Sequence, residues 1–582
     1  MTRTDTFVVG TLVLVLAIVA ALIGVPALQL SSSTSPLASA PGSGPATVTR
    51  PYIEGALGAP ASVTPLTART QVDRDLVALL FSGLVRNGPD GTLVPDLAER
   101  WSVDKSGRIW TVDLREDARW HDGQPVTSDD VLFTIETLQD PSYAGPSSTS
   151  WSEVTVSASS PHRVVFTLET PLGGFLQALT QPLAPAHLLG DVPVDALADD
   201  PFGQQPLGSG PFALVELTDT SASLVPAGDF VPVEEDPSAV PSSPAPPDSL
   251  GTPAPTDRPS RPQPYLAGIE FRFYDDSAKL AADFQSGVVD GASGISRQEA
   301  AGLGSEAGTR LLRYPGATLT TVLLNLRPAH PEFASPAIRT ALLQAIDRVR
   351  LIDEAYAMSA ASATGPIPPS SPLFDPGADP VVPYDRFGAS RALTKAGWDH
   401  KKDGWYLPDA KKPITLEVVS PTQGTNPGLF AAAEAVVRDW KALGFKVSHV
   451  PLPPAEFVTD RLATGTFQAA VVDVTVGLDP DLYPLLASSQ TLTGGSNVMG
   501  VQDPTLDALL VKARAPGTEA ARKTAYSALQ KQLATGRYLL PLAFADEVVV
   551  AHDTLAGPVL RQASDPSDRF WDVLTWRLAV DR

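Results

Sequence analysis

The chain has 582 residues and a formal net charge of −22. This length exceeds what one hydrophobic core supports, so two large lobes or domains are expected. The acidic balance and the lack of a basic stripe exclude a nucleic-acid-binding protein, because phosphate recognition requires clustered lysine and arginine. There are no cysteines, which excludes disulfides, thiolate metal sites and a cysteine nucleophile.

The N-terminal region contains an uncharged apolar segment, FVVGTLVLVLAIVAALIGVPALQL, over residues 7–30. A bilayer requires about 20 apolar residues, so this segment predicts a transmembrane helix. Arg3 precedes it and the next basic residue is Arg50, which favours an inside N-terminus with the bulk of the chain outside. A cleaved signal peptide is the alternative, because LASA at residues 37–40 resembles a cleavage site, although Pro41 follows it. We predict an uncleaved, single-pass anchor in the cell membrane.

Two stretches are predicted to lack packed structure. Residues 31–50 are small and polar, with interspersed proline and glycine, which is typical of a flexible stalk. Residues 232–264, PVEEDPSAVPSSPAPPDSLGTPAPTDRPSRPQP, cannot bury enough apolar surface to offset their ordering entropy. We interpret them as a disordered surface loop between two ordered strands; a docking segment for a partner is the alternative.

Elsewhere, short apolar strands alternate with amphipathic helices, a pattern that predicts α/β layers. The predicted strands are IWTVDLR (109–115), RVVFTL (163–168), TVLLNL (321–326), ITLEVV (414–419) and FKVSHV (445–450). Helices are predicted over residues 336–356 and 428–444, the second ending at Gly444 as a C-cap.

The stretch RWHDGQPVTSDDV, residues 119–131, raises the question of a catalytic or metal site. Thr127 with Asp130 three residues later has the spacing of a capping box, and VLFTIETLQ then continues as an amphipathic helix. Asp129 and Asp130 would lie in the first turn, where the helix dipole favours negative charge. His121-Asp122-Gly123 is typical of a tight turn, and the other histidines are single and scattered, unlike metal ligands. We therefore predict scaffolding, with no metal site and no catalytic dyad.

Twelve short motifs follow one another along the chain from residue 83 to residue 544, and their order and spacing can be compared with those of known protein families. They are GLV (83–85), LVPDLAERW (93–101), WTVDLREDARWHDGQPVTSDDV (110–131), PLGSGPF (206–212), PYLAGIEFRFYDD (264–276), FQSGVVDGA (284–292), LLNL (323–326), IRTALLQAIDR (338–348), KAGW (395–398), ALGFKV (442–447), GSNVMGVQDPTLDALL (495–510) and LLPLAF (539–544). This series resembles the family 5 extracellular solute-binding proteins, the oligopeptide, dipeptide and nickel-type receptors of ABC importers.

The resemblance implies an α/β, two-lobed periplasmic-binding-protein-like fold of type II, the large peptide-binding class, behind an N-terminal transmembrane helix. Strands near 318–326 and 539–544 would cross between the lobes, which close around a ligand that contacts both. The implied boundaries are an anchor at 1–30, a stalk at 31–50, lobe 1 at 51–325, lobe 2 at 326–539 and a return to lobe 1 at 540–582.

The implied function is that of a membrane-tethered extracellular substrate-binding protein of an ABC importer, capturing peptides or a related small organic solute. Its partners would be that solute, the ABC permease subunits and the cell membrane; we expect a monomer without nucleic acid, cofactor or metal. A surface sensor or interaction protein of the same fold is the alternative. An enzyme is not expected, because neither a G-x-S-x-G elbow nor an H-E-x-x-H helix occurs.

Peptide-binding members of the family often carry an aspartate in a W-x-A-D-Y-like segment, because a buried peptide ammonium requires such a partner. In VVDVTVGLDPDLYP, residues 471–484, Val476 stands at that aspartate position and Asp473 at the tryptophan position. Asp473, Asp479 and Asp481 are candidate replacements, although Asp479 and Asp481 are also compatible with turn or cap roles.

Five further residues are candidate ligand contacts. Thr320, Thr321 and Asn325 lie on the proposed crossover strand, where ladder or hinge roles are the alternative. Asn497 follows two glycines at a position near the family's cleft, and a turn role is equally compatible. Trp151 is a candidate for stacking on a ligand, with packing at a lobe edge as the alternative.

Overall fold

The computed structural model describes residues 50–88, 92–143, 145, 151, 153–228, 266–477, 479–491 and 495–579. The predicted anchor, the stalk apart from Arg50, and the proline-rich insertion at 232–264 lie outside these residues. Among the residues described, no helix is both long enough and apolar enough to cross a bilayer.

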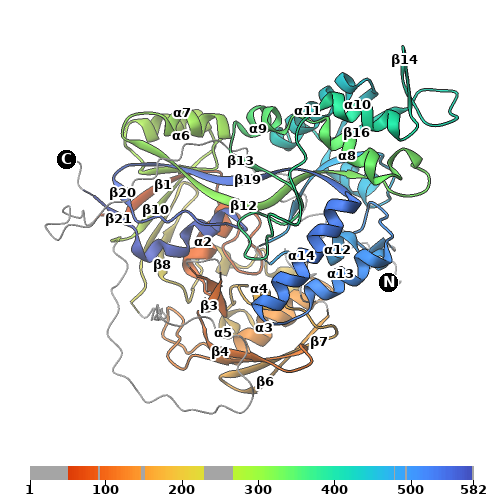
Figure 1. Ribbon diagram of the computed structural model, residues 1–582. Coiled ribbons are helices and arrows are strands. Elements are labelled where there is room, and N and C mark those ends of the chain that lie inside the picture. The colour runs from red at the N-terminus through yellow and green to blue at the C-terminus, as the bar shows by residue number, and fades with distance from the viewer. Residues whose placement is uncertain are drawn as a thin grey trace, which may run out of the picture.

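A sheet of 11 strands runs through both halves of the molecule (Figure 1). Its strand order is β17-β16-β18-β12-β19-β11-β1-β10-β9-β8, and β13 pairs with β19. The strands β12 (Thr309–Leu324) and β19 (Leu539–His552) pair antiparallel and extend into both ends of the sheet. The segments predicted to cross between the lobes lie on these two strands, within the core at one end of the sheet, and the strands continue from there into the other core.

Lobe 1 forms one end of the sheet. Its strands are β1 (Tyr52–Leu57), β8 (Phe212–Leu217), β9 (Ser221–Pro226), β10 (Ile269–Tyr274) and β11 (Gly291–Ser293). Its main helices are α2 (Gln71–Leu80), α6 (Ser277–Gln285), α7 (Arg297–Gly304) and the C-terminal 3-10 segment η7 (Pro566–Thr575). One apolar core lies under α6 and α7, and a larger one joins the rest of the lobe to the C-terminal segment.

A smaller antiparallel sheet extends lobe 1 at the bottom of Figure 1. Its order is β4 (Ala98–Val103), β5 (Ile109–Leu114), β7 (Arg163–Leu168) and β6 (Val154–Ser160). Alternate residues of β5 are buried, as the period of a half-buried strand requires. The short elements β2 (Val85–Asn87), β3 (Leu93–Pro95), α4 (Phe175–Ala178) and α5 (Ala186–Leu189) complete the region.

The helix α3 (Ser128–Gln139) packs against this smaller sheet and begins with the predicted capping box. The backbone N–H of Thr127 donates to Asp130 Oδ2 at 2.8 Å, and Thr127 Oγ1 accepts from Asp129 N at 3.3 Å. Trp120 Nε1 and Ala186 N also donate to the Asp130 carboxylate, at 3.3 and 2.9 Å. Asp130 therefore ties three segments of the lobe together, and the prediction of scaffolding is confirmed for this residue.

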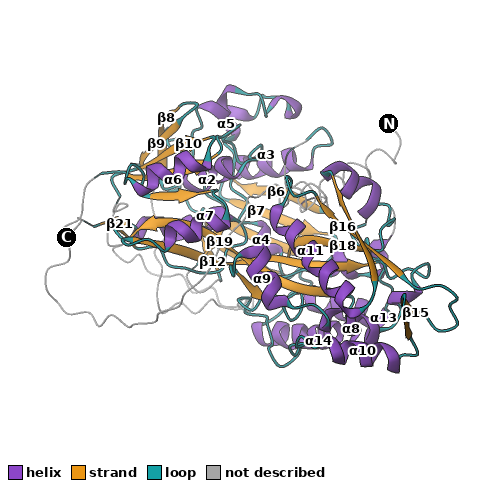
Figure 2. Cartoon of the chain, turned by 90° about the horizontal axis from the view of Figure 1, so that it is seen from above, coloured by secondary structure: helices purple, strands orange, loops and turns teal. Residues whose placement is uncertain are grey.

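Lobe 2 forms the other end of the sheet. Its strands are β13 (Ala360–Ser362), β16 (Thr415–Pro421), β17 (Lys446–Leu452) and β18 (Ala469–Thr475), with a separate hairpin of β14 (Asp399–Lys401) and β15 (Gly404–Tyr406). Its helices are α8 (Pro336–Gln344), α9 (Arg348–Tyr356), α10 (Arg386–Lys395), α11 (Pro427–Leu443), α12 (Tyr483–Leu486), α13 (Pro504–Arg514) and α14 (Glu519–Gly536). Seen from above in Figure 2, α9 and α11 of this lobe and α6 and α7 of lobe 1 lie over the sheet.

Two helix predictions in lobe 2 have different outcomes. The helix α11 ends as predicted at Gly444, which adopts the left-handed φ of 106° that glycine tolerates. The single helix predicted over 336–356 is wrong, because α8 ends at Gln344 and α9 begins at Arg348. Asp347 separates them: its side chain accepts from Arg350 N at 3.1 Å, and its own N–H donates to Asp439 Oδ2 at 2.9 Å. These bonds make Asp347 the N-cap of a new helix.

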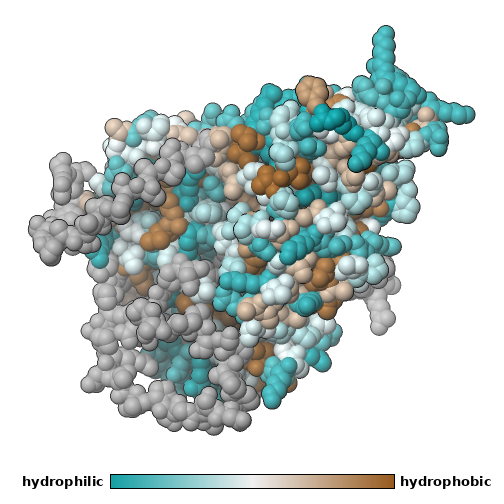
Figure 3. All heavy atoms as spheres, viewed as in Figure 1, coloured by the Kyte–Doolittle hydropathy of each residue, from teal (hydrophilic) through white to brown (hydrophobic). Residues whose placement is uncertain are grey.

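The surface shown in Figure 3 is mainly hydrophilic, with apolar side chains scattered among polar ones. Among the most exposed large apolar side chains are Val349, Val381 and Phe387 of lobe 2. Single exposed apolar residues are ordinary on folded proteins and need no functional explanation.

Candidate functional site

The crossover strands pass from one core to the other at an irregular point. The register between β12 and β19 shifts between Tyr314 and Thr318, as in a β-bulge, which bends a strand locally. Gly316 is required there, because a Cβ at this position would lie 1.9 Å from the Ala545 carbonyl oxygen. The two lobes therefore meet where the strand pairing is interrupted.

Polar side chains from both lobes gather at this point, and we call Arg297, Thr320, Tyr356, Asp473 and Asp546 the junction cluster. Thr320 Oγ1 donates to Asp473 Oδ1 at 2.6 Å and lies 2.6 Å from the Tyr356 hydroxyl. The guanidinium of Arg297 stacks over the Tyr356 ring at 5.0 Å and donates to the Asp546 backbone carbonyl at 3.2 Å. Arg297 begins α7 of lobe 1, whereas Tyr356 and Asp473 belong to lobe 2, so the cluster joins the lobes.

Burial sets the protonation of the cluster. It raises the pKa of Asp473 to about 6, and the Thr320 hydrogen bond and the Arg297 charge counteract that rise only partly. Burial also raises the pKa of Asp546 and lowers that of Arg297. Nε of Arg297 has no hydrogen-bond partner among the residues described. Carboxyls that resist ionisation beside an unsatisfied guanidinium are typical of sites that a polar ligand completes.

Arg313 extends the cluster along β12. Its Nη1 lies 4.0 Å from Asp546 Oδ2, and both side chains are 16% exposed. Within the described residues, Nε and Nη2 of Arg313 have no hydrogen-bond partner, and burial lowers the pKa of this side chain. Arg313 therefore brings a second guanidinium to the junction whose N–H donors lack hydrogen-bond partners among the described residues.

Of the ligand contacts predicted from the sequence, Thr320 and Asp473 lie in the junction cluster. Thr321 and Asn325 are buried and serve backbone carbonyls: Thr321 Oγ1 donates to Leu540 O at 2.8 Å, and Asn325 Nδ2 donates to Gly465 O and Phe467 O at 2.9 and 2.8 Å. These contacts match the ladder and hinge roles that were the alternative.

Two other predicted contacts lie away from the junction. Asn497 is buried and donates to Ala487 O and Val501 O, each at 3.0 Å, so it organises its own turn. Trp151 is 2% exposed, with its ring centroid 6.1 and 5.8 Å from those of Phe166 and Phe175. It packs inside the lobe 1 core rather than at a lobe edge.

Asp479 lies where the smaller sheet of lobe 1 contacts lobe 2. Both of its oxygens accept from Arg522, at 2.5 and 2.6 Å. A Cβ at Gly174 of lobe 1 would lie 3.3 Å from the Asp479 carboxyl carbon. Next to it, Gly173 N donates to the Arg514 carbonyl at 2.7 Å. The lobes are thus joined by a second contact, which we call the glycine contact, formed by Gly173 and Gly174 against Asp479 and Arg514.

The sequence reasoning missed Arg297, Tyr356 and Asp546. Two signals pointed toward them. Asp546 and Glu547 interrupt the otherwise apolar strand LLPLAFADEVVVAH, and acidic residues inside a central strand require a special reason. Arg297 stands in the first turn of α7, where the helix dipole disfavours a cation.

One other group has the connectivity of a hydrolase triad. Ser420 Oγ lies 2.8 Å from His449 Nε2, and Glu434 contacts His449 Nδ1. However, Ser420 is 0% exposed and its hydroxyl also donates to Pro421 O at 2.9 Å. A nucleophile needs access to a substrate and a proton that its base can remove, so this group supports the strand pairing of β16 and β17.

The histidine of the RWHDGQP stretch is also structural. His121 Nδ1 accepts from Gly208 N at 3.3 Å, and its Nε2 lies 3.0 Å from Gly210 O, so it fastens the PLGSGPF turn. Asp122 pairs instead with His187 at 2.9 Å. No three His, Asp or Glu side chains in the described ranges are placed to share a metal ion.

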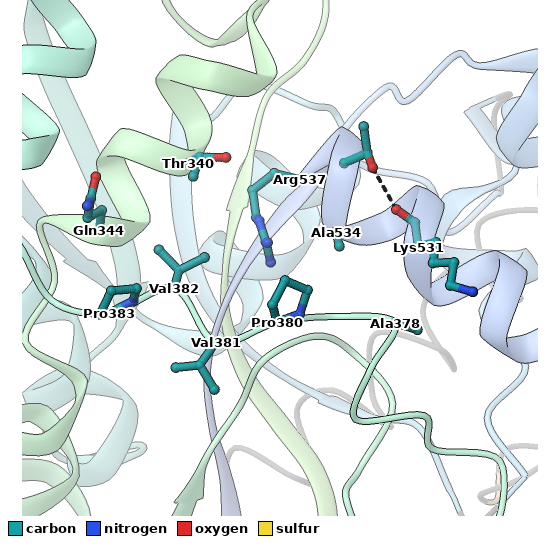
Figure 4. Close-up of a pocket in the computed structure, with 11 residues that line it drawn as sticks. Thr340, Gln344, Ala378, Pro380, Val381, Val382, Pro383, Lys531, Ala534 and Arg537 are labelled. Carbon is teal, nitrogen blue, oxygen red and sulfur yellow. Dashed lines mark hydrogen bonds between the residues drawn. The ribbon is translucent and has the colours of Figure 1, made fainter.

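Two surface pockets lie entirely in lobe 2. One, of about 410 Å³, is lined by α8, α14 and residues 378–383, with Arg537 between them (Figure 4). The other, of about 820 Å³, lies between α8, α10 and the β15 region. Because no residue of lobe 1 lines either pocket, a solute bound there would not bring the lobes together.

Comparison with known proteins identifies the family. A model of the bacterial extracellular solute-binding proteins, family 5 Middle, matches residues 92–497, which is more than half of the chain. The chain belongs to this family. Membership confirms the expectation from the sequence motifs and places the chain among extracellular solute binders rather than enzymes.

The relatives extend over most of the chain. Protein XP55 of Streptomyces lividans is 27% identical over 511 residues, covering 86% of this chain and 85% of its own. Di/tripeptide-binding protein 3 of Pseudomonas aeruginosa is 25% identical, covering 87% and 90%. The solved structure of the oligopeptide-binding protein AppA from Bacillus subtilis, in complex with a nonapeptide, superposes with a TM-score of 0.67 at 20% identity, covering 92% of this chain and 100% of that one. This likeness confirms the periplasmic-binding-protein-like α/β fold.

Proposed function

We propose that this protein captures a peptide or a related small organic solute between its two lobes and delivers it to an ABC importer. The junction cluster is the observation that supports this most. Arg297 of lobe 1 and Tyr356 and Asp473 of lobe 2 meet there, and the Arg297 and Arg313 guanidinium groups keep unsatisfied donors. A solute that accepts from these lobe 1 donors and also reaches Tyr356 or Asp473 contacts both lobes at once, which is what ligand-driven closure requires.

The names of the relatives support the cargo class. One is a di/tripeptide-binding protein, and AppA was solved with a nonapeptide. Thr320 and Asp473 remain the sequence-derived residues in the proposed site, joined now by Arg297, Tyr356 and Asp546. Asp479 is committed to Arg522, so it acts in lobe contact rather than in direct solute binding.

We also propose that residues 7–30 anchor the protein in the cell membrane, with the lobes on the outer face as a monomer that meets the ABC permease subunits. The support is the uncharged segment and the absence of Lys or Arg between it and Arg50. Intact mass measurement of the protein from isolated membranes tests the anchor. A chain that starts after Ala40, in the soluble fraction, would contradict it.

Thermal unfolding of the purified chain against peptides, sugars, opines and Ni²⁺ tests the binding function. A solute that binds only the folded state raises stability by about 2.7 kcal/mol at a hundredfold excess over its Kd. Short peptides are expected to raise the melting temperature, and Arg297→Met is expected to abolish the rise. Arg119→Met, which removes a half-buried arginine of lobe 1 whose side chain donates to the Glu116 and Ala118 carbonyls, is the matched control. Stabilisation by none of the solutes would refute the proposal.

A further inference from the structure

The hairpin of β14 and β15 projects from lobe 2, away from the large sheet (Figure 1). In Figure 3 the same projection is hydrophilic. Its base is fixed in the lobe 2 core, because the side chain of Trp405 is buried and its Nε1 donates to the Leu443 carbonyl oxygen at 2.9 Å. The Trp405 ring centroid also lies 6.2 Å from that of Phe445. Packing therefore holds the hairpin in place while its charged side chains face solvent.

Lysines concentrate on and around this hairpin. The chain has 12 lysines, and seven of them stand between residues 395 and 446. All seven are exposed, and we call them the lysine surface: Lys395, Lys401, Lys402, Lys411, Lys412, Lys441 and Lys446.

The three lysines outside the hairpin lie next to it. Lys395 ends α10, the helix that leads into the hairpin. Lys446 begins β17, and its Cγ lies 4.0 Å from the position of a Cβ on Gly404 of β15. Lys441 stands in the last turn of α11, and the C-cap of that helix lies against His400 of β14. Segments that are separate in the chain thus contribute to one surface.

The positive charges of the lysine surface exceed the negative charges around them. Three aspartates of the hairpin lie among the lysines, namely Asp399, Asp403 and Asp409. Lys401 lies 3.3 Å from Asp399, and the other six lysines form no ion pair with a described residue. The remaining acids of this region are already paired: Glu417 contacts Arg461, Glu434 contacts His449 and Asp439 contacts Arg438. Seven lysines against three aspartates leave an excess of four positive charges on a chain whose formal net charge is −22.

The residue type indicates an extended anionic layer as the partner rather than one anion in a shaped pocket. The planar fork of arginine recognises a single carboxylate or phosphate in a fixed geometry, whereas lysine is a hydrated point charge on a flexible stem. Residues 395–446 contain seven lysines and a single arginine, Arg438, which pairs with Glu354 and Asp439. Flexible point charges suit a surface of many loosely placed anionic groups, and anionic lipid headgroups form such a surface.

The projecting shape of the hairpin also suits a membrane. Exposed charges attract one another only within about 8 Å, the Debye length at physiological ionic strength. A projecting hairpin brings its lysines within that distance of a bilayer while most of the acidic body of the chain stays farther away. An anionic membrane thus attracts this end of lobe 2 and repels the acidic remainder of the chain.

We propose that the lysine surface docks on the anionic phospholipid headgroups of a membrane and thereby turns lobe 2 toward the bilayer. This contact is separate from the proposed anchor at residues 7–30, and it does not depend on which solute the lobes capture. The anchor would keep the hairpin near such headgroups, and the hairpin would fix how the lobes are oriented above them.

The absence of cysteine from the sequence allows the hairpin to be labelled at one place. Ala410→Cys introduces a single thiol near the lysines, which carries a donor fluorophore for energy transfer to an acceptor-labelled lipid. The full chain is inserted in vesicles of phosphatidylcholine alone, or of phosphatidylcholine and phosphatidylglycerol in equal parts. Transfer is expected to be at least about twofold more efficient on the anionic vesicles, because lysines are attracted to anionic lipid. The gain should disappear in about 1 M salt, where the Debye length falls to about 3 Å.

Two charge variants of the labelled chain locate the contact. One replaces the four hairpin lysines, as Lys401→Gln, Lys402→Gln, Lys411→Gln and Lys412→Gln, and is expected to lose the gain. The matched control makes the same change of net charge at four exposed lysines elsewhere, as Lys105→Gln, Lys279→Gln, Lys512→Gln and Lys523→Gln, and is expected to keep it. Should the first variant fail to fold, the exposed single substitution Lys402→Glu replaces it and is expected to lose at least about half of the gain.

Equal transfer on the two kinds of vesicle would overturn the inference, and so would a gain that persists in high salt. A gain that both fourfold variants lose equally would also overturn it, because the contact would then follow net charge rather than the lysine surface. If the chain leaves the neutral vesicles, the proposed anchor is contradicted, and the inference stands or falls on the transfer of the same variants added to anionic vesicles. Solute capture is tested separately, by thermal unfolding, so neither result decides the other.

Discussion

Replacement of Arg569 by methionine tests how lobe 1 holds its C-terminal segment. The guanidinium is buried between two acids: Nη2 donates to Glu54 Oε1 at 2.6 Å and to Asp75 Oδ2 at 2.5 Å, and Nη1 donates to Asp75 Oδ1 at 2.8 Å. The side-chain exposures of Arg569, Glu54 and Asp75 are 3%, 0% and 2%. Burial alone would lower the pKa of Arg569, but the two carboxylates outweigh it and raise that pKa well above its usual value.

The size of the expected destabilisation follows from the two carboxylates, Glu54 and Asp75, that Arg569→Met leaves without a cation. Two carboxylates would remain buried without a cation, and protonating each at pH 7 costs at most about 4 kcal/mol. Breaking a buried ion pair by removing one partner costs about 3–5 kcal/mol. We therefore expect Arg569→Met to lower the free energy of unfolding of lobe 1 by about 4 kcal/mol, or roughly 10 °C in its melting temperature.

Calorimetric unfolding at pH 7 and pH 5 measures this effect. The defect is expected to shrink at pH 5, because the stranded carboxylates then take up protons at less cost. The matched control is Arg100→Met, because Arg100 is 66% exposed and contacts Asp113 at 2.7 Å; an exposed pair contributes at most about 1 kcal/mol. Adding Glu54→Gln and Asp75→Asn to Arg569→Met should recover most of the loss. A loss below about 1 kcal/mol in the single variant would refute the reasoning.

Three further predictions concern the helix cap and the two lobe contacts. Asp130→Ala should lower the free energy of unfolding in urea by about 2 kcal/mol, since it leaves buried donors unpaired. The control Asp129→Ala, at an exposed position, should change stability by less than about 0.5 kcal/mol. Equal effects of the two substitutions would contradict the capping role of Asp130. Gly174→Leu should push Asp479 away and increase the radius of gyration of the ligand-free chain in X-ray scattering; an unchanged radius would argue against the glycine contact. Asp473→Asn should stabilise the ligand-free protein at pH 7 by up to about 3 kcal/mol. Because the pKa of Asp473 is raised to about 6 in the fold, the stability of the wild type falls as pH rises from about 4 to about 6. The advantage of the variant should therefore vanish below about pH 4. A stability difference that stays constant across pH would exclude this titration.

Features that depend on neighbouring residues were predictable. The capping box of Thr127 and Asp130 and the C-cap at Gly444 each depend on residues at most a few positions apart, so their spacing in the chain carries the information. The break between α8 and α9 was not predictable in the same way. Asp347 is held by Asp439, 92 residues away, and that partner is invisible to a reading of local periodicity.

In the candidate site, too, the contacts depend on residues that are distant in the chain and could not be predicted from local sequence. Thr320 and Asp473 were chosen from the chain one by one, but their hydrogen bond spans 153 residues and depends on the pairing of β12 with β18. Thr321 is adjacent to Thr320 in sequence, yet it points to the Leu540 carbonyl, because successive residues of a strand face opposite sides of a sheet. One position in the chain thus separates a residue of the junction cluster from a residue that only holds the strands together.

The sequence by itself determined the family, the α/β class, the crossover strands and the scaffolding role of the RWHDGQP stretch, because motifs, periodicity and caps are local patterns. Only the tertiary structure decided which charges meet. It brought Arg297 to Tyr356, left the Tyr314 hydroxyl without a hydrogen-bond partner among the described residues, and committed Asp479 to Arg522. The physical reason is that burial and charge pairing are set by groups that are distant in the chain and adjacent only after the two lobes have packed along the same sheet.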